Sequence, residues 1–179
     1  DADAQYNLGV MYENGEGVPK DYKEALRLYT LAANQGQVKA QSNLGVIYYE
    51  GRAVPQDYEE AVRWYTLAAK QGDAMAQFNL ASMYEDGYGV SQDYREAIKF
   101  YTLAARQGYA KAQSNLGLMH YNGQGVLADP VIAHMWFNIA AANGAESAGA
   151  NRDIIAKEMT SEDISKAEAM ARACFNSNY

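Results

Sequence analysis

The sequence contains few of the residues that build metal centres, disulfide frameworks and covalent catalytic sites. It has one cysteine, two histidines and three prolines in 179 residues. A single cysteine excludes an internal disulfide framework and any zinc site built from several cysteines. A chain of this length can bury a sizeable core within one domain, and 49% of its residues are hydrophobic. This composition excludes disorder over most of the chain.

Positive charge is also scarce. The chain has 15 Lys and Arg residues against 22 Asp and Glu residues, which gives a formal net charge of −7. This balance argues against nucleic-acid binding and against an electrostatic attachment to anionic membranes. The longest mostly apolar stretch, residues 131–142, is interrupted by polar side chains and is too short for membrane insertion. The chain starts at Asp1 without a recognisable signal peptide, so we interpret it as an excised or processed piece.

What the sequence does contain is a repeat of 36 residues. The segment Thr-Leu-Ala-Ala occurs three times, a looser form occurs a fourth time, and a glycine ends each copy. Such self-similarity at a fixed period is the signature of a repeat architecture. We assign four repeats and a tail to residues 1–36, 37–72, 73–108, 109–144 and 145–179.

The first half of each repeat is predicted to form a helix. In the first repeat, Ala4, Leu8, Met11 and Tyr12 lie at helical spacing and form one apolar face. We expect this helix to end at Gly15, because glycine tolerates the left-handed conformation of a helix C-cap.

The second half of each repeat is predicted to form another helix. Asp21 with Glu24 three residues later makes a capping-box pattern, and in the fourth repeat Asp129 is followed by Pro130, which suits a first helical position. The second helix buries its alanines and aromatic residues and ends at the glycine that closes the repeat.

The tail is predicted to cover the last repeat. Residues 145–159 are similar to one more first helix, and Thr160 with Ser161 supplies an N-cap for a final helix. A solenoid needs such an end to cover its last apolar face. The first repeat has no equivalent cap, so we expect an exposed edge or a missing upstream helix there, and self-association through that edge. The buried stripe of the final helix is expected to contain Ile164, Ala167, Ala171 and Cys174.

The repeat pattern resembles the Sel1-like repeat family, which is related to the tetratricopeptide repeat but has a longer turn between its helices. The resemblance covers all four repeats. It implies an all-α, right-handed superhelical solenoid over residues 1–179, with a scaffold or adaptor role and no enzymatic activity. Members proposed to act on cell-wall fragments carry paired cysteines in their repeats, which this chain lacks. The second repeat shows the motif in full as Ala40, Leu44, Gly45, Tyr48, Gly51, Val54, Asp57, Ala61, Trp64, Tyr65, Ala68, Ala69 and Gly72.

No arrangement of residues in the sequence predicts catalysis. For His120 and His134 we favour packing or surface roles over a metal pair, and for Cys174 a small buried side chain over a nucleophile. A disulfide between Cys174 and a cysteine beyond Tyr179 remains an open alternative. The paired glycines of the turns lack the lysine of a phosphate-binding loop. We therefore predict no catalytic residue, no cofactor and no metal.

A binding surface remains as the candidate site. A rotation of about 100° per residue places the third, sixth, tenth and thirteenth positions of each first helix opposite its core face. In tetratricopeptide-like geometry that side lines a concave groove. Several of these side chains are too apolar for an idle surface, although packing between repeats is the alternative. The predicted partner-binding groove consists of Tyr6, Asn7, Val10, Lys39, Asn43, Val46, Tyr49, Phe78, Asn79, Lys111, Asn115, Leu118 and Tyr121.

The four asparagines in this set recur at the seventh position of each repeat. A side-chain amide both donates and accepts hydrogen bonds, so a ladder of asparagines could hold the backbone of an extended peptide. Alternatively, each asparagine braces a neighbouring helix or turn. Together these features predict a non-enzymatic scaffold or adaptor that binds a protein or peptide; the alternative is a receptor for a small molecule or cell-wall fragment.

Overall fold

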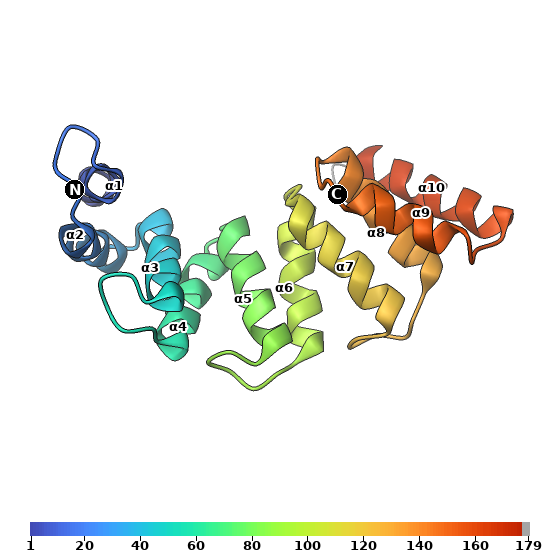
Figure 1. The fold of residues 1–179 in the computed structure, drawn as a ribbon, viewed down its shortest axis with the longest axis horizontal. Coiled ribbons are helices and arrows are strands. Elements are labelled where there is room, and N and C mark those ends of the chain that lie inside the picture. The colour runs from blue at the N-terminus through green and yellow to red at the C-terminus, as the bar shows by residue number, and fades with distance from the viewer. Residues whose placement is uncertain (177–179) are drawn as a thin grey trace. The chain divides into compact units, whose positions relative to one another are not determined.

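The computed structural model describes residues 1–176, and their side chains as far as Cys174. The described residues form ten α-helices and no strand, so the predicted all-α class is confirmed (Figure 1). The helices are α1 (Ala2–Asn14), α2 (Tyr22–Asn34), α3 (Val38–Glu50), α4 (Tyr58–Lys70), α5 (Ala74–Asp86), α6 (Tyr94–Arg106), α7 (Ala110–Asn122), α8 (Pro130–Ala142), α9 (Ala148–Ala156) and α10 (Ser161–Asn176).

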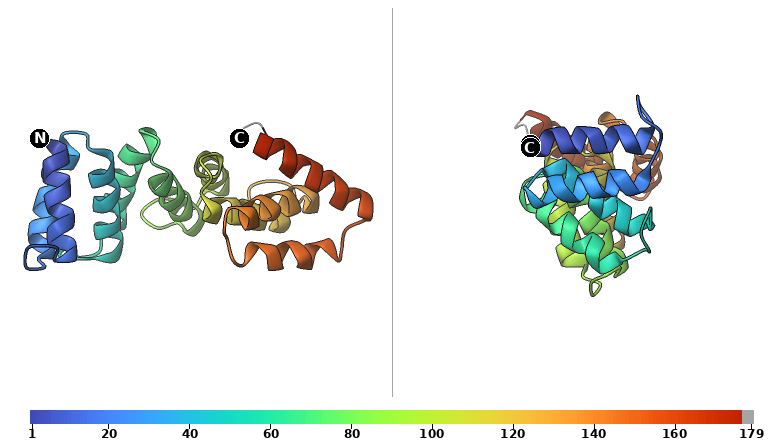
Figure 2. Two further views of the ribbon diagram at one scale, coloured as in Figure 1. Left: turned by 90° about the horizontal axis from the view of Figure 1, so that it is seen from above. Right: turned by 90° about the vertical axis from the view of Figure 1, so that its left-hand side faces the viewer.

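The chain divides into two compact units. The first is Asp1–Gln92 with helices α1 to α5, and the second begins at Asp93 with α6. Successive helices from α1 to α5, and from α6 to α9, pack side by side within their units, as the pairs α1–α2 and α3–α4 show in Figure 2, whereas α10 packs against α8. The boundary between the units falls inside the third repeat. One continuous solenoid over the whole chain stays a prediction.

The glycine C-caps and the aspartate N-caps are present, but the predicted capping box is wrong in its second half. Asp21 N donates to the carbonyl oxygen of Tyr12, and the Glu24 carboxylate pairs with Arg27 instead. The first helix of each repeat ends at a glycine in the left-handed conformation, with φ between +69° and +77°. The second helix of each repeat begins at an aspartate whose side chain accepts hydrogen bonds from backbone N–H groups of the first turn. These caps satisfy backbone groups that have no partner inside the helix. They fix the bounds of eight helices close to the predicted ones.

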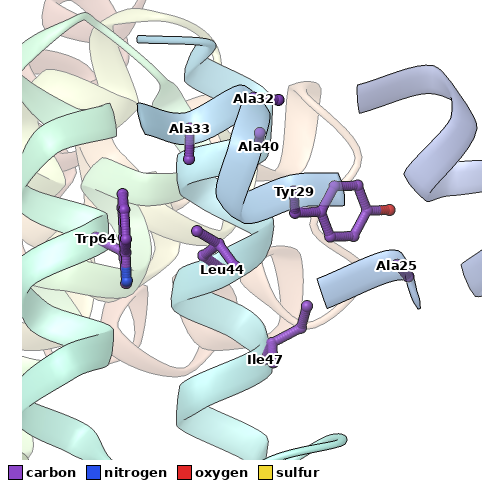
Figure 3. Close-up of a cluster of buried hydrophobic side chains, with 8 residues drawn as sticks. All are labelled: Ala25, Tyr29, Ala32, Ala33, Ala40, Leu44, Ile47 and Trp64. Atoms are coloured by element: carbon purple, nitrogen blue, oxygen red, sulfur yellow. The ribbon is translucent and has the colours of Figure 1, made fainter. Parts of the chain in front are cut away.

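The core of the first unit is made of alanines and aromatic rings that face each other between helices. Figure 3 shows Tyr29 of α2 close to Leu44 of α3, with Trp64 of α4 beyond them. Tyr29 and Leu44 are both fully buried. The backbone of Gly45 lies directly against the ring of Tyr65, so a β-carbon has no space there. Small residues therefore set how closely neighbouring helices approach.

A buried glutamine at the fifth position of each later repeat was not predicted. Gln41 Nε2 donates to the carbonyl oxygen of Ala33 at 3.1 Å, and Gln113 Nε2 donates to that of Ala105 at 2.9 Å. The carbonyl acceptors lie at the C-terminal ends of α2 and α6, where helical backbone oxygens lack partners. Each glutamine therefore ties a first helix to the second helix that precedes it.

The N-terminal edge of the first unit is exposed. Leu8 is 38% exposed, whereas Leu44 at the equivalent position of the next repeat is fully buried. Met11 is 37% exposed, whereas its equivalent Ile47 is buried. The difference arises because Leu44 and Ile47 face α2, while no helix of the described chain precedes α1. This side of α1 is exposed within the described residues. A missing upstream helix and self-association through this edge both stay predictions.

The tail differs from its prediction in one helix. Residues 145–159 were expected to form a full helix, but α9 covers only Ala148–Ala156. The expectation was wrong at both ends, because Ser147 makes no side-chain cap bond and residues 157–159 continue only with bonds of the i to i−3 type. By contrast α10 has the predicted cap, since the Thr160 hydroxyl oxygen accepts from Asp163 N at 3.1 Å. Of the predicted buried stripe of α10, Ala167 and Ala171 are buried against α8, whereas Ile164 and Cys174 are only half-buried.

Candidate partner-binding site

An open pocket of about 210 Å³ lies among α3, α4 and α5 of the first unit. Two of its walls are the first helices of successive repeats, and the third is the helix between them. Tyr49, Phe78 and Asn79, which line it, belong to the predicted groove. The full lining consists of Tyr49, Tyr65, Phe78, Asn79 and Ser82.

The residues of α5 reach the pocket because of their spacing. Phe78 and Ser82 are four residues apart, so they lie one above the other on the same helix face. Serine occupies the position of Phe78 in the second and fourth repeats, at Ser42 and Ser114. An aromatic residue therefore occupies this position only in the first repeat, as Tyr6, and in the third, as Phe78.

Two lining residues, Ser82 and Tyr65, are absent from the predicted groove. Rotation within a first helix can place Ser82, but it cannot place Tyr65. Tyr65 belongs to a second helix, is 2% exposed, and forms a side-chain hydrogen bond with Asn79. Burial raises the pKa of its hydroxyl well above the ordinary value, and the negative charge of Glu50 raises it further. The hydroxyl therefore stays protonated and can both donate and accept a hydrogen bond beside the aromatic walls.

A cluster of three tyrosines, the tyrosine stack, adjoins the pocket through Tyr49. Tyr58 and Tyr88 are nearly parallel, and Tyr49 is tilted by 55° against Tyr58. The ring of Tyr49 lies 5.5 Å from that of Tyr58 between centroids, and Tyr58 stacks on Tyr88 at 4.8 Å with an interplanar angle of 17°. Burial raises the pKa of Tyr49, and Tyr58, Tyr88, Asp86 and Glu50 all add to the shift. Of these groups, the carboxylates of Asp86 and Glu50 are charged at neutral pH and make the potential around Tyr49 negative.

Three of the predicted asparagines brace the repeats. Asn115 Nδ2 donates to the hydroxyl oxygen of Tyr101 at 2.8 Å, and Asn79 makes the corresponding contact with Tyr65. Asn43 forms side-chain hydrogen bonds with Tyr29 and with the predicted groove residue Tyr6. Tyr101, Tyr65 and Tyr29 belong to the preceding second helix, and Tyr6 belongs to α1. These contacts correspond to the bracing alternative. Asn7 of the first repeat is exposed.

Tyr6 lies in a hydrogen-bonded network instead of an open groove. Its ring is half-buried, with its centroid 5.7 Å from that of Tyr29. The Tyr29 hydroxyl donates to Glu13 Oε2 at 2.6 Å, and Arg52 Nη1 donates to Glu13 Oε1 at 3.4 Å. Burial raises the pKa of Tyr6, and the charge of Glu13 adds to this effect. Val10 packs against the same buried cluster.

The other predicted groove residues differ in exposure. Val46 is half-buried, and Lys39 is exposed. In the second unit Lys111 is exposed, Leu118 is 40% exposed, and Tyr121 packs beside the cluster that contains Phe137. The Tyr121 hydroxyl also donates to Glu158 Oε2 at 3.3 Å. Within the first unit, the structure brings together Tyr49, Phe78 and Asn79 at one pocket.

The histidines and the cysteine lie in packed surroundings in the second unit. His134 is 3% exposed, and burial lowers the pKa of both His134 and His120. Cys174 is half-buried beside Ala171. In the described part of the chain, no three His, Cys, Asp or Glu side chains come together as a metal-binding group. Among the same residues, none of the helices combines the length and apolarity that crossing a bilayer requires.

Comparison with known families agrees with the observed repeats. The Sel1 repeat model matches residues 2–37, 38–73, 74–109 and 110–144. The chain belongs to the Sel1 repeat family. The matched Sel1 repeats begin one residue later than those assigned from the sequence. Sel1 repeat proteins generally mediate protein–protein interactions, and the family typically acts as a non-catalytic scaffold.

Solved structures of Sel1 repeat proteins have the same fold. A protective antigen of uropathogenic Escherichia coli that displays an SLR fold is 38% identical, with a TM-score of 0.88 over 96% of this chain. A Sel1 repeat protein from Oxalobacter formigenes is 35% identical, with a TM-score of 0.81 over 85% of this chain. The present chain covers 37% and 63% of the lengths of these two proteins. Comparison with curated proteins gives no match.

Proposed function

We propose that this Sel1 repeat chain is a scaffold or adaptor that binds a protein or peptide segment on the surface of its first helices. The pocket of Tyr49, Tyr65, Phe78, Asn79 and Ser82 would anchor one apolar side chain of the partner. The observation that carries this proposal is the convergence of three aromatic rings with an amide and a hydroxyl. Aromatic rings in a pocket are common interface hot spots, and the polar groups can fix the orientation of the ligand.

The size of the pocket favours a side chain over a whole small molecule. Its volume of about 210 Å³ is below the range of roughly 300–1,000 Å³ that small-molecule sites occupy. The other proposed role, as a receptor for a small molecule or cell-wall fragment, is therefore less well supported. Binding of the chain to a peptide array but not to a glycan and muropeptide array would separate the two.

The anchor pocket can be tested with Phe78→Ser. Serine is the residue of the second and fourth repeats at this position, so the variant should fold. A random heptapeptide phage library selected on the chain supplies the probe peptides. We expect Phe78→Ser to weaken their binding by about 30-fold, the equivalent of one hot spot of about 2 kcal/mol.

The matched control is Leu127→Ser. Leu127 is 92% exposed in a turn of the second unit, so its removal deletes an apolar side chain away from the pocket. Peptide affinity should remain unchanged in this control. Full peptide affinity in Phe78→Ser, with a native melting curve, would contradict the anchor pocket.

We also propose that the exposed face of α1 allows two copies of the chain to associate. Leu8 and Met11 are more than one third exposed although their equivalents Leu44 and Ile47 are core residues. Sedimentation velocity over a range of concentrations tests this proposal, with Leu8→Gln as the variant. Association that Leu8→Gln weakens supports the α1 face, and a wild-type chain that stays monomeric at high concentration contradicts it.

A further inference from the structure

Two rings of the tyrosine stack lie at the C-terminal ends of first helices, and the third lies at the start of the second helix between them. Tyr49 is the penultimate residue of α3, and Tyr88 follows the glycine that caps α5. Tyr58 begins α4 and contacts both rings. Tyr88 is 41% exposed, so part of the aromatic surface is open to a ligand. The stack and the pocket share Tyr49 and are therefore adjacent parts of one surface.

The acidic residues beside this stack lie at helix ends where the helix dipole disfavours negative charge. Glu50 and Asp86 are the last residues of α3 and α5, where the helix dipole is negative and favours cations. Neither helix has a basic residue in its last turn. The first and fourth repeats have the neutral residues Asn14 and Asn122 at this position. The two carboxylates therefore reduce local stability unless a cation compensates them.

Among the side chains that the structure describes, Glu50 has such a cation and Asp86 has none. Arg52 forms ion pairs with Glu50 and Glu13. Among residues 1–176, the Asp86 carboxylate accepts a hydrogen bond from Ser82 Oγ at 3.5 Å and has no lysine or arginine partner. Ser82 also lines the pocket, so Asp86 lies next to both the pocket and the tyrosine stack.

The net charge of the first unit also favours a cationic partner. Residues 1–92 contain thirteen acidic and seven basic residues, a net charge of −6. The remaining nine acidic and eight basic residues leave −1 for residues 93–179. A cationic partner is therefore attracted to the unit that contains the pocket.

The position of Tyr88 is fixed before any ligand binds. Gly89 has a φ of +68°, and its backbone contacts the carbonyl group of Tyr58 so closely that a β-carbon has no space. This contact holds the turn against the start of α4 and keeps the two rings stacked. A rigid aromatic surface loses little entropy on binding.

We propose that Tyr49, Tyr58 and Tyr88, together with Asp86, bind a lysine or arginine side chain of the same peptide whose apolar side chain enters the pocket. The tyrosine faces supply cation–π attraction, and arginine can in addition stack on them. Asp86 and the C-terminal ends of α3 and α5 supply the negative charge that attracts the lysine or arginine. The inference rests on the proposed peptide-binding function and specifies the partner as a basic peptide.

Fluorescein-labelled peptides with one fixed phenylalanine in random uncharged flanks test this inference. Matched sets carry lysine, arginine, norleucine or glutamate one, two or three positions after the phenylalanine. Norleucine keeps most of the length of lysine and removes its charge. Measured by fluorescence anisotropy, the lysine and arginine sets should bind roughly 3- to 10-fold more tightly than the norleucine set. Added salt should reduce this difference.

Two variants with matched controls locate the cation site. Asp86→Asn and Tyr88→Gln introduce the residues that the fourth repeat has at these positions, so both should fold. Each should remove most of the advantage of lysine over norleucine and leave norleucine binding unchanged. Glu146→Gln removes an exposed carboxylate of the second unit. It should change neither the advantage of lysine over norleucine nor the affinity of the norleucine set.

The outcomes separate this inference from the function on which it rests. Equal binding of the lysine and norleucine sets, or a lysine advantage that persists in both variants, overturns the cation site and leaves the apolar anchor intact. If no set binds, the anchor pocket and the cation site are both rejected. A lysine advantage that disappears in Asp86→Asn and Tyr88→Gln, but not in Glu146→Gln, supports the inference.

Discussion

Asn115 Nδ2 of α7 donates a hydrogen bond of 2.8 Å to the hydroxyl oxygen of Tyr101 in α6. Tyr101 is fully buried, so this amide supplies a partner to a hydroxyl that water does not reach. Asn79 and Tyr65 make the same contact in the first unit. The same pair at the same spacing therefore links α7 to α6 and α5 to α4.

Replacing Asn115 with alanine should destabilise the second unit by about 1–3 kcal/mol, because it leaves the buried Tyr101 hydroxyl without this donor. Urea unfolding measures the effect. In Tyr101→Phe the hydroxyl is absent, so Asn115→Ala should cost much less in that background. Equal costs in the two backgrounds would show that the hydrogen bond contributes no stability.

Leu80 and Leu8 occupy the same repeat position but differ in burial, at 1% and 38% exposed. Leu80→Ala should lower the free energy of unfolding by about 2–5 kcal/mol, because it leaves a cavity in the core. Leu8→Ala should cost less than about 1 kcal/mol, since much of its side chain already contacts water. Hydrogen exchange should locate the Leu80 effect in α4 and α5. Similar costs for the two variants would contradict the exposed edge of α1.

Gly89→Ala should cost more stability than Gly17→Ala, although both glycines have a left-handed backbone with φ of +68° and +75°. The shared backbone strain costs about 1–2 kcal/mol. Only residue 89 also meets the backbone of Tyr58, whereas a β-carbon at residue 17 would contact only Met11 Cε at 3.5 Å. We expect about 1–3 kcal/mol of additional cost for Gly89→Ala, by analogy with overpacked cores. Its tyrosine ring NMR signals should also shift as the Tyr58–Tyr88 stack is disturbed; unshifted signals would argue against this close contact.

Ala53→Gly should stabilise the chain. Ala53 has a φ of +62° and is the one non-glycine residue among those described with a positive φ. The corresponding turn residues of the other repeats are glycines. Relief of the strain, partly offset by the greater freedom of glycine in the unfolded chain, should add about 0.5–1 kcal/mol. A lower urea midpoint in the variant would contradict this expectation.

Stability should fall as the pH drops below about 6.5, the usual pKa of histidine in an unfolded chain. Burial lowers the pKa of His120 and His134 in the folded chain; nearby Arg152 lowers that of His134 further, while Glu168 and Asp153 oppose it. The unfolded state therefore takes up protons at a higher pH than the folded state. Urea unfolding between pH 7.5 and 5.5 measures the resulting slope.

The double variant His120→Tyr and His134→Ile is the control for this pH effect. Tyr84 and Ile98 occupy the two equivalent positions in the third repeat, so both replacements suit the fold. The slope of stability against pH should become shallower. An unchanged slope would assign the pH dependence to other groups.

Periodicity predicts much of this fold because apolar residues and caps recur with the repeat. Leu80 follows from helical spacing, and Asp129 follows from its place before a helix. Gln41 does not, since a polar residue is assigned to the surface by any hydrophobic pattern. Its burial depends on an unpaired carbonyl of the preceding helix.

The candidate site could be predicted only in part for a similar reason. Tyr49 and Phe78 follow from rotation about their own helices. Tyr65 reaches the same pocket from a different helix, through a packing register that a pattern within one helix does not contain. The same register decides that Tyr6 joins a buried network and Tyr121 packs beside Phe137.

The glutamine contacts have an evolutionary consequence. Gln41 and Gln113 each bond a carbonyl eight residues earlier, and Gln71 and Asn143 bond a glutamine side chain thirty residues earlier. Because these offsets are the same in different repeats, unequal recombination that inserts or deletes 36 residues would create a junction that keeps these glutamine contacts. Repeat number can therefore change in one genetic event without a compensating substitution in these contacts.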